Sequence, residues 1–430
     1  MNWGLFLILA FGLLLGLLFA GVRIFAAFLA LNLLGLTLLL GPRGFGLFSN
    51  SIFETATSPS LMTVALFVLM GEILFRSGTV GVLFDSIDRL IGRLPGRLYV
   101  VTIVLSTVFG ALSGSAVAVA AMLGRSVLPL MQGRGYDSRL SAGSVLAGAS
   151  LAPIIPPSLL AVIVGSLADV SIAGLLVAGI LPGILFAALT LAYVFLKAKK
   201  GAAADVPAAA EGSALGAALR MTPFLLVVLS VMGLIFLGVA TPSESAATGV
   251  VGAIVVAAIF GRLSRAMLAE AIGSAVVVSG VILVIVCSAK LFSQLLSLAG
   301  ATRGLVSLVA GLQLGPDLTF LLMMLIPFVL CMFIDQIAFM LLAIPIYQPV
   351  VAAMGYDPIW FWTLFLIILT VGSLTPPFGY TLFALKGASD RLSTSEVFSS
   401  AWPIVGIFVL GMAVLWAVPE IVTLIPGAVR

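Results

Sequence analysis

Residues 140–168 read LSAGSVLAGASLAPIIPPSLLAVIVGSLA, an uncharged stretch long enough to cross a lipid bilayer as one tilted segment. Proline removes a backbone donor and clashes with the preceding turn, so Pro156-Pro157 should break the helix inside this span. Residues 358–385 repeat the pattern: they carry no charge and contain Pro376-Pro377. The sequence therefore predicts two spans whose helices are interrupted within the bilayer.

The composition of the chain is that of a membrane protein. Of its 430 residues, 62% are hydrophobic and 8% are charged, and the mean hydropathy is +1.32. A soluble domain carries roughly 25% charged residues. The chain has no histidine, and its two cysteines, Cys287 and Cys331, lie in apolar runs. These features exclude a disulfide framework, a cysteine-based metal site and histidine catalysis. We expect no organic cofactor and no enzymatic activity, because the sequence shows no histidine, no paired acids and no metal-ligand spacing. We also expect no nucleic-acid partner, because basic residues in membrane proteins mostly mark orientation.

Apolar stretches follow one another almost from end to end. We expect them at 3–20, 22–40, 59–77, 97–131, 140–168, 172–196, 222–240, 246–261, 268–298, 317–351, 358–385 and 398–425, with short segments at 83–95 and 303–314. Residues 97–131 and 317–351 are short for two full crossings plus a turn, so we interpret each as a re-entrant hairpin. The expected tips are Leu112-Ser113-Gly114-Ser115 and Asp335-Gln336.

The distribution of basic residues supports this topology. If both hairpins return to their own side and both Pro-Pro segments cross, fifteen basic residues share one side: Arg23, Arg76, Arg89, Arg93, Arg97, Arg134, Arg139, Lys197, Lys199, Lys200, Arg220, Arg262, Arg265, Lys386 and Arg391. Arg43, Arg303 and Arg430 fall on the other side, and Arg125 and Lys290 fall inside the membrane. The positive-inside rule then places both termini outside the cytoplasm. Tryptophans near the span ends are expected to form an interfacial belt: Trp360, Trp362, Trp402 and Trp416.

The two halves of the chain align when the sequence is shifted by 220 residues. Gly135-Tyr136-Asp137 meets Gly355-Tyr356-Asp357, the two Pro-Pro pairs coincide, and Ser115 meets Asp335. Five crossings separate the two Gly-Tyr-Asp turns, so the repeats should have opposite orientations in the membrane. Inverted repeats with broken helices are typical of secondary transporters, which bind substrate and ions near the midplane where the breaks meet.

The candidate site residues also have structural interpretations. Ser113, Gly114 and Ser115 are small and would let two helices pack closely. Asp335, in an apolar run, is either a functional carboxylate beside a cation site or one half of an ion pair with a residue such as Lys290. Gly372-Ser373-Leu374-Thr375-Pro376-Pro377 taken alone would be an ordinary proline kink. The matching Ile154-Ile155-Pro156-Pro157-Ser158 favours a designed break. Thr241-Pro242-Ser243-Glu244 is expected to start a helix as a capping box.

Several motifs resemble those of one family, the large membrane subunit of the tripartite ATP-independent periplasmic (TRAP) transporters. They are LSGSAVAVAAMLG (112–124), IIPPS (154–158), TPSESAATG (241–249), DQIAFMLLAIPIYQPV (335–350) and LTPPFGYTLFALKG (374–387), and the resemblance covers nearly the whole chain. It implies an all-α polytopic fold with two re-entrant hairpins and two broken helices. The implied function is sodium-driven uptake in the bacterial inner membrane by an elevator motion. The implied partners are a small four-helix membrane subunit and a periplasmic binding protein that delivers an organic acid: a C4-dicarboxylate, 2-oxo acid or sugar acid.

The resemblance also implies domains and site residues. The first repeat is 1–196 (scaffold 1–95, transport elements 97–168), the cytoplasmic linker is 197–220, and the second repeat is 221–430 (scaffold 221–314, transport elements 317–385). The implied sodium ligands are Ser113, Ser115, Ala152, Ile154, Pro156, Asp335, Gly372, Thr375 and Phe378. The implied substrate-site residues are Ser113, Gly114, Ser115, Pro156, Pro157, Ser158, Asp335, Gln336, Ser373, Pro376, Pro377 and Thr381. The chain departs from many relatives at Ala116, where they have serine or threonine, and at Gln336, where they have proline.

Two other functions stay open on the sequence alone. A stand-alone sodium:carboxylate symporter of similar build would transport without a binding protein. A non-transporting membrane assembly or channel subunit would tolerate Ser115→Ala, Asp335→Asn or Thr375→Ala without loss of uptake.

Overall fold

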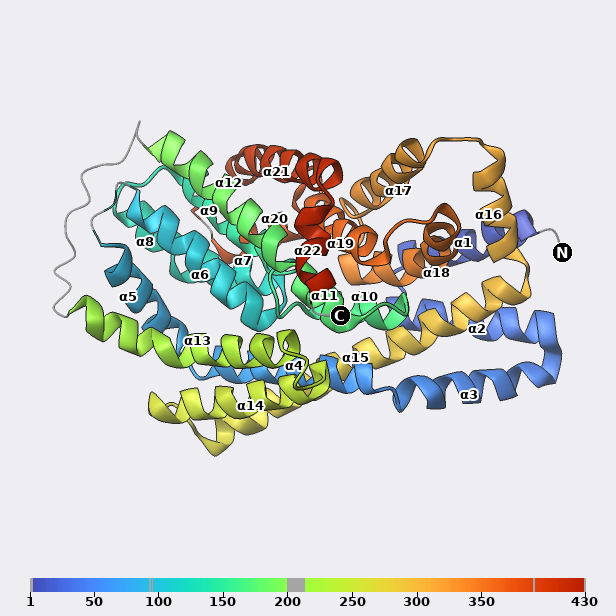
Figure 1. Ribbon diagram of the computed structural model, residues 1–430, viewed down its shortest axis with the longest axis horizontal. Coiled ribbons are helices and arrows are strands. Elements are labelled where there is room, and N and C mark those ends of the chain that lie inside the picture. The colour runs from blue at the N-terminus through green and yellow to red at the C-terminus, as the bar shows by residue number, and fades with distance from the viewer. Residues whose placement is uncertain (1–2, 93, 95, 199–212, 390, 429–430) are drawn as a thin grey trace.

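The computed structural model describes residues 3–92, 94, 96–198, 213–389 and 391–428, and all regular secondary structure in this part of the chain is helical (Figure 1). Nine helices there are long and apolar enough to cross a membrane. The first half contains α1 (Trp3–Phe19), α2 (Ile24–Leu40), η1 (Gly41–Arg43), α3 (Gly44–Ala56), α4 (Pro59–Arg76), α5 (Val80–Ile91), α6 (Arg97–Ser113), α7 (Ala116–Ser126), α8 (Leu128–Gly133), α9 (Ser138–Leu151), α10 (Leu159–Leu167), α11 (Ile172–Ala178) and α12 (Ile180–Ala198). Most of the expected linker, at 199–212, lies outside the described residues.

The second half repeats the first at an offset of 220 residues. It contains α13 (Ala214–Phe236), α14 (Pro242–Ile259), α15 (Arg265–Leu298), α16 (Ala301–Gly311), α17 (Pro316–Leu330), α18 (Gln336–Met354), α19 (Pro358–Leu374), α20 (Tyr380–Ala388), α21 (Thr394–Ala417) and α22 (Glu420–Ala428). Helix α9 begins at Ser138 and α19 at Pro358, and the side chains of Asp137 and Asp357 cap these two helices in the same way. The internal repeat thus extends from sequence to element boundaries.

Both expected hairpins form, and they enter from opposite ends of the molecule. Hairpin 1 consists of α6, α7 and α8, and hairpin 2 consists of α17 and α18. Figure 1 shows hairpin 1 toward one end of the long axis and hairpin 2 toward the other, with their tips near the middle. This opposition is what an inverted repeat predicts.

The two Pro-Pro segments are interrupted as the sequence predicts. Helix α9 ends at Leu151 and α10 begins at Leu159, while α19 ends at Leu374 and α20 begins at Tyr380. Both Pro-Pro peptide bonds are cis. Each interruption brings a helix start to the level of the hairpin tips, in the interior of the molecule (Figure 1).

Long helices outside the hairpins pack side by side along one flank. The 34-residue α15 contacts α2, α3 and α4, and α14 packs on both α4 and α13. Helix α3 was not expected from the sequence, because Ser49, Asn50, Ser51 and Glu54 interrupt its apolar character. Its Ser51 is buried and donates a hydrogen bond to Gln294 Oε1 of α15 at 2.7 Å. A tertiary contact therefore satisfies the hydroxyl of Ser51, one of the polar residues that interrupt the apolar character of α3 in the sequence.

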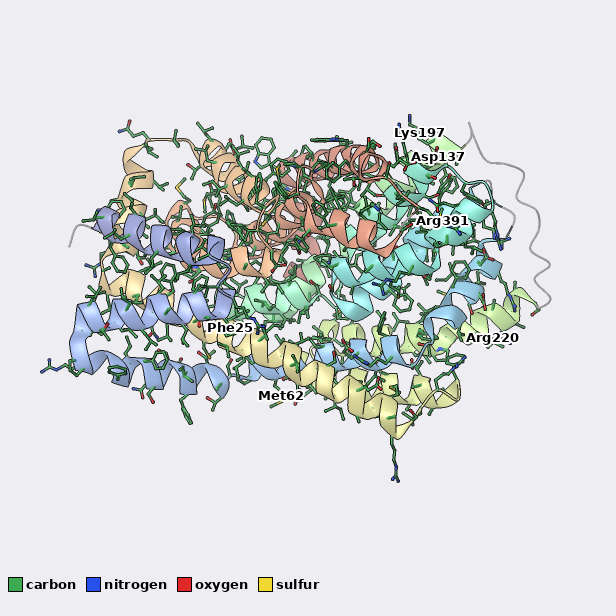
Figure 2. All side chains as sticks on the ribbon, turned by 180° about the vertical axis from the view of Figure 1, so that it is seen from behind. Phe25, Met62, Asp137, Lys197, Arg220 and Arg391 are labelled. Atoms are coloured by element: carbon green, nitrogen blue, oxygen red, sulfur yellow. The ribbon has the colours of Figure 1, made fainter. Side chains whose placement is uncertain are left out.

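Basic residues gather at one end of the molecule. Figure 2 shows Lys197, Arg220 and Arg391 together at the end that also carries Asp137. This clustering agrees with the predicted shared side. Phe25, near the start of α2, lies toward the middle of the molecule instead (Figure 2). The loop before α2, which carries Arg23, therefore lies away from the end where Lys197, Arg220 and Arg391 cluster. The division into scaffold and transport elements stays a prediction.

Candidate functional site

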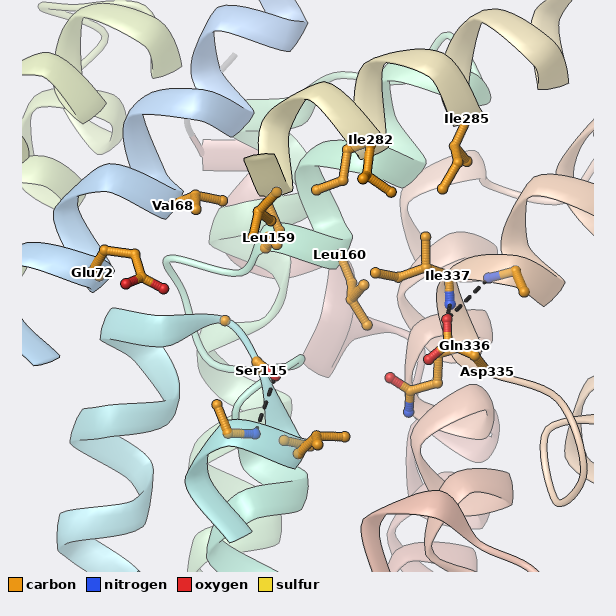
Figure 3. A pocket seen from close by; sticks show the side chains of 18 of the residues that line it. Val68, Glu72, Ser115, Leu159, Leu160, Ile282, Ile285, Asp335, Gln336 and Ile337 are labelled. Atoms are coloured by element: carbon orange, nitrogen blue, oxygen red, sulfur yellow. Dashed lines mark hydrogen bonds between the residues drawn. The ribbon is translucent and has the colours of Figure 1, made fainter. Parts of the chain in front are cut away.

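A cavity of about 590 Å³ lies where the hairpin tips and the two breaks converge. One wall belongs to the long helices, and we call it the α4–α15 wall: Val68, Gly71, Glu72, Phe75, Val277, Val278, Val281, Ile282 and Ile285. The opposite side is formed by Gly114, Ser115, Ala116, Val117, Ala118, Leu159, Leu160, Asp335, Gln336, Ile337, Ala338 and Tyr380. Figure 3 shows Val68, Glu72, Ile282 and Ile285 facing Ser115 and Asp335. Its volume is within the range of small-molecule sites.

Four helices start at this cavity. The first residues of α7, α10, α18 and α20, which are Ala116, Leu159, Gln336 and Tyr380, all line it. The first turn of a helix has unpaired N–H groups and the positive end of the helix dipole. The starts of α7, α10 and α20 favour an anionic ligand, because each contributes donors and partial positive charge, whereas the Asp335 carboxylate caps the start of α18. No Lys or Arg is among the described residues of the lining.

The tip of hairpin 1 is seated on the first break. Gly114 has φ +64°, and a Cβ at this position would lie 2.8 Å from Leu159 Cβ at the start of α10. A Cβ at Gly110 of α6 would lie 2.6 Å from Ala152 Cβ. Ser115 caps α7, its Oγ accepting from the Ala118 N–H at 3.3 Å (Figure 3). Small residues therefore allow the close approach that brings this tip to the cavity.

The tip of hairpin 2 is tied to the second break by hydrogen bonds. Asp335 Oδ1 accepts from the N–H groups of Ile337 at 3.0 Å and Ala338 at 3.2 Å, so the carboxylate caps α18. Gln336 Nε2 donates to Ser373 Oγ at 2.9 Å, across to α19. The Gly379 N–H, just before α20, donates to the Met332 carbonyl at 3.0 Å. The tip and the break thus form one connected unit.

The structure brings the sequence-predicted residues into two layers. Gly114, Ser115, Asp335 and Gln336 line the cavity. Behind them Ser158, Ser373 and Thr381 are buried: Ser158 Oγ accepts from Ala161 N at 3.2 Å, and the Ser373 and Thr381 hydroxyls are 3.4 Å apart. The residues of the breaks that complete the predicted set are Ala152, Ile154, Pro156, Pro157, Gly372, Thr375, Pro376, Pro377 and Phe378. The side chain of Ser113 lies outside the described part of the chain.

The alternative ion pair for Asp335 is not formed among the described residues. Lys290 lines a separate polar pocket of about 460 Å³ together with Asp169 and Ser166, away from the hairpin tips. Arg125 lies on α7, and its side chain is exposed on the surface of the molecule. Neither basic residue belongs to the central cavity.

The oxygen groups around the tips suit a hard monovalent cation. Sodium prefers hydroxyl, carboxylate and carbonyl oxygens, and the described residues contain no cluster of three His, Cys, Asp or Glu that would suggest a transition metal. A Cβ at Gly379 would lie 3.0 Å from both the Ser373 and Thr375 carbonyl oxygens, so two backbone acceptors converge there. Thr375 Oγ1 donates to the Val371 carbonyl at 2.6 Å, which leaves its lone pairs available as acceptors.

Glu72 is a charged residue of the cavity that the sequence-based candidates do not include. Its Oε2 accepts from Arg76 Nε at 2.8 Å, and Arg76 Nη1 also donates to Glu270 Oε2 at 3.0 Å. The sequence-based candidates lie at the hairpin tips and breaks, whereas Glu72 lies in α4, where its sequence signal is an acid four residues before an arginine in an apolar span. Tyr380, the first residue of α20, also lines the cavity and is not among those candidates.

Comparison with known proteins identifies relatives along nearly the whole chain. The family model of the tripartite ATP-independent periplasmic transporter, DctM component, matches residues 5–421. The Ectoine/5-hydroxyectoine TRAP transporter large permease protein of Ruegeria pomeroyi is 29% identical over 359 residues, covering 83% of each chain. The C4-dicarboxylate TRAP transporter large permease protein of Pseudomonas aeruginosa is 26% identical over 394 residues, covering 91% of each chain.

A solved structure shares the fold. The crystal structure of the Alcanivorax borkumensis YdaH transporter, described as having an unusual topology, superposes with a TM-score of 0.64 at 15% sequence identity and covers 88% of each chain. At this identity the likeness concerns the fold alone. The match of the family model to residues 5–421, together with the paired hairpins and breaks, shows that this chain belongs to the family of large membrane subunits of TRAP transporters.

Proposed function

We propose that this chain is the permease subunit of a sodium-coupled secondary transporter that imports an organic acid by an elevator mechanism. The observation that carries the proposal is the convergence of four helix starts and two hairpin tips on one cavity. The helix starts suit the carboxylate of the substrate, and the oxygens around Ser115, Asp335 and Thr375 suit sodium. A bound sodium ion would add positive charge beside the carboxylate, so the two ligands would bind cooperatively.

The α4–α15 wall supports relative motion of the two sides. Apart from Glu72, the wall presents one glycine and apolar side chains, most of them valine and isoleucine. An apolar surface lets one body slide along another at little cost, because its side chains form no hydrogen bonds that must break. The hairpins and breaks would then carry substrate past this wall as one unit.

The proposal extends to partners and location. As a member of the family, the chain would work in the bacterial inner membrane with a small four-helix membrane subunit and a periplasmic binding protein, with both termini on the periplasmic side. The relatives are named for ectoine and for C4-dicarboxylates. The substrate of this chain would be an organic acid of the C4-dicarboxylate, 2-oxo acid or sugar-acid type.

Uptake by proteoliposomes tests the proposal. Vesicles that hold both membrane subunits, with the binding protein outside, should accumulate the organic acid only under an inward sodium gradient. Undiminished uptake with no sodium on either side would contradict sodium coupling. Uptake without the binding protein would favour the stand-alone symporter. Unchanged uptake by Ser115→Ala, Asp335→Asn and Thr375→Ala variants would favour the non-transporting subunit.

A further inference from the structure

Glu72 is the one carboxylate that the α4–α15 wall presents to the cavity among the described residues. Its side chain is 25% exposed, and Figure 3 shows the carboxylate pointing toward the tip of hairpin 1. The neighbouring wall residues Val68, Val278, Val281, Ile282 and Ile285 offer no polar atom. A ligand that touches this wall therefore meets a single polar group.

Arg76 holds Glu72 in place without occupying all of its acceptor capacity. The arginine is bonded through Glu72 Oε2, while Glu72 Oε1 has no hydrogen-bond partner among the described residues. Arg76 is also shared with Glu270, whose side chain is 65% exposed. Two carboxylates on one guanidinium leave the cluster with a net charge of −1, so the cavity side of Glu72 keeps acceptor character and negative charge.

The two sides of the cavity therefore favour different chemical groups on the ligand. The starts of α7, α10 and α20 on one side suit a carboxylate, and the proposed sodium ion would balance the charge of Asp335 there, whereas the Glu72 carboxylate accepts hydrogen bonds and repels a second carboxylate. From this arrangement, and resting on the function proposed above, we infer that the substrate carries a hydrogen-bond donor, a hydroxyl or a protonated nitrogen, on the end away from its carboxylate, and that Glu72 selects it.

Glu72→Gln tests this role without disturbing the fold. Arg76 offers only donors, so the amide oxygen of glutamine will turn toward Arg76 and its NH₂ group will face the cavity. The substitution keeps the bond to Arg76 but places a donor where the acceptor was. The matched control is Glu270→Gln, which removes the charge of the other Arg76 partner and lies outside the cavity lining.

The measurement is ligand binding by the purified complex of both membrane subunits in saturating sodium. Binding is detected as the rise in unfolding temperature that the ligand causes. Two matched series serve as probes: propionate, 3-hydroxypropionate and 3-aminopropionate, and butyrate, 4-hydroxybutyrate and 4-aminobutyrate. Members of each series differ mainly in whether they carry a hydroxyl or an ammonium group. Using the complex instead of uptake removes the selectivity of the binding protein from the readout.

The wild type and Glu270→Gln should bind the hydroxyl or ammonium member of a series more tightly than the plain member. A hydrogen bond to a charged group corresponds to roughly a 10-fold to 100-fold preference. Glu72→Gln should abolish or reverse this preference at unchanged unfolding temperature. Equal preferences in the wild type and Glu72→Gln would overturn the inference while leaving the proposed function intact. Stabilisation by none of the acids, with or without sodium, would overturn both.

Discussion

Ser115 and Asp335 occupy the same position in the two repeats, and both cap the second helix of a hairpin. The cap explains why an oxygen-bearing residue is required at each tip, because the first N–H groups of α7 and α18 have no partner within their helices. It does not require a charge. The carboxylate of Asp335 is therefore the residue whose functional and structural parts can be separated by substitution.

Asp335→Asn should keep the cap and remove the charge, since the asparagine oxygen can accept from the same N–H groups. We expect an unchanged unfolding temperature and a sodium KM for uptake that rises by roughly 10-fold, equivalent to about 1.4 kcal/mol of lost cation binding. Asp335→Ala should in addition destabilise the protein by about 1 kcal/mol through loss of the cap. A sodium KM that is the same in the wild type and the asparagine variant would remove Asp335 from the cation site.

Burial at single residues is another feature that sequence position predicts poorly. Trp360 and Trp362 lie near a span end, but they are 8% and 1% exposed and pack among aromatic rings of α17 and α19. The Trp360 Nε1–H donates to the Leu415 carbonyl at 3.1 Å. Trp402 and Trp416 are 56% and 41% exposed, as residues of an interfacial belt would be. The expected belt is thus wrong for two of the four tryptophans.

At the scale of elements, close backbone contact seats hairpin 1 against the first broken helix. A Cβ at Gly110 would lie 2.7 Å from the Ala152 Cα, and one at Gly148 of α9 would lie 2.2 Å from Ser106 Cβ of α6. The structural interpretation of small residues as packing contacts therefore holds along the hairpin, while the functional one applies at its tip. Both roles coexist in one segment.

Gly110→Val should separate hairpin 1 from the broken helix. Because the obstructing atoms include backbone, the clash cannot be relieved by a side-chain rotation, and we expect destabilisation of roughly 1–3 kcal/mol with loss of uptake. Gly406→Val in α21 is the matched control, since nothing lies within 4 Å of a Cβ there. Thermal unfolding in detergent checks both variants, and equal unfolding temperatures would contradict the packing argument.

The junction between α5 and hairpin 1 contains a buried ion pair. Arg97 Nε donates to Asp88 Oδ1 at 2.6 Å, and its Nη2 pairs with Asp88 Oδ2; the two side chains are 8% and 12% exposed. Asp88→Ala leaves the guanidinium buried without this partner. We expect a loss of roughly 3–5 kcal/mol in the free energy of unfolding, because the buried guanidinium loses the carboxylate it pairs with.

The exposed Arg76–Glu270 pair provides the comparison for this junction. Glu270→Ala should change the free energy of unfolding by less than about 1 kcal/mol, since solvent screens the pair. Similar unfolding midpoints for Asp88→Ala and Glu270→Ala would show that the Asp88–Arg97 pair does not hold α5 to hairpin 1.

At the scale of the whole molecule, the inverted repeat predicts opposite sidedness for the two Gly-Tyr-Asp turns. Arg134→Cys and Ala353→Cys place thiols on exposed positions beside these turns. A membrane-impermeant maleimide should label one variant only from outside intact cells and the other only after the membrane is opened. The native Cys287 and Cys331 are buried, so their background labelling should be low. Labelling of both variants from the same side would contradict the inverted arrangement.

Much of the architecture could be predicted from local sequence. Charge-free length predicts the spans, proline pairs predict the breaks at 152–158 and 375–379, and the 220-residue shift predicts the second copy of each. The capping box at Thr241 and Glu244 forms as expected. These features depend on backbone chemistry and on hydrophobicity, which each residue carries with it. Helix α3 was missed because its polar residues are satisfied only by contact with α15.

The amino-acid sequence alone determined that this protein is an all-helical membrane protein with two opposed copies of a broken-helix unit, because bilayer thickness and proline geometry act on short stretches of chain. Only the tertiary structure decided that Glu72, 263 residues before Asp335, shares a cavity with it, and that Lys290 does not. Which distant groups meet is set by how whole helices pack, and packing depends on all of their side chains together.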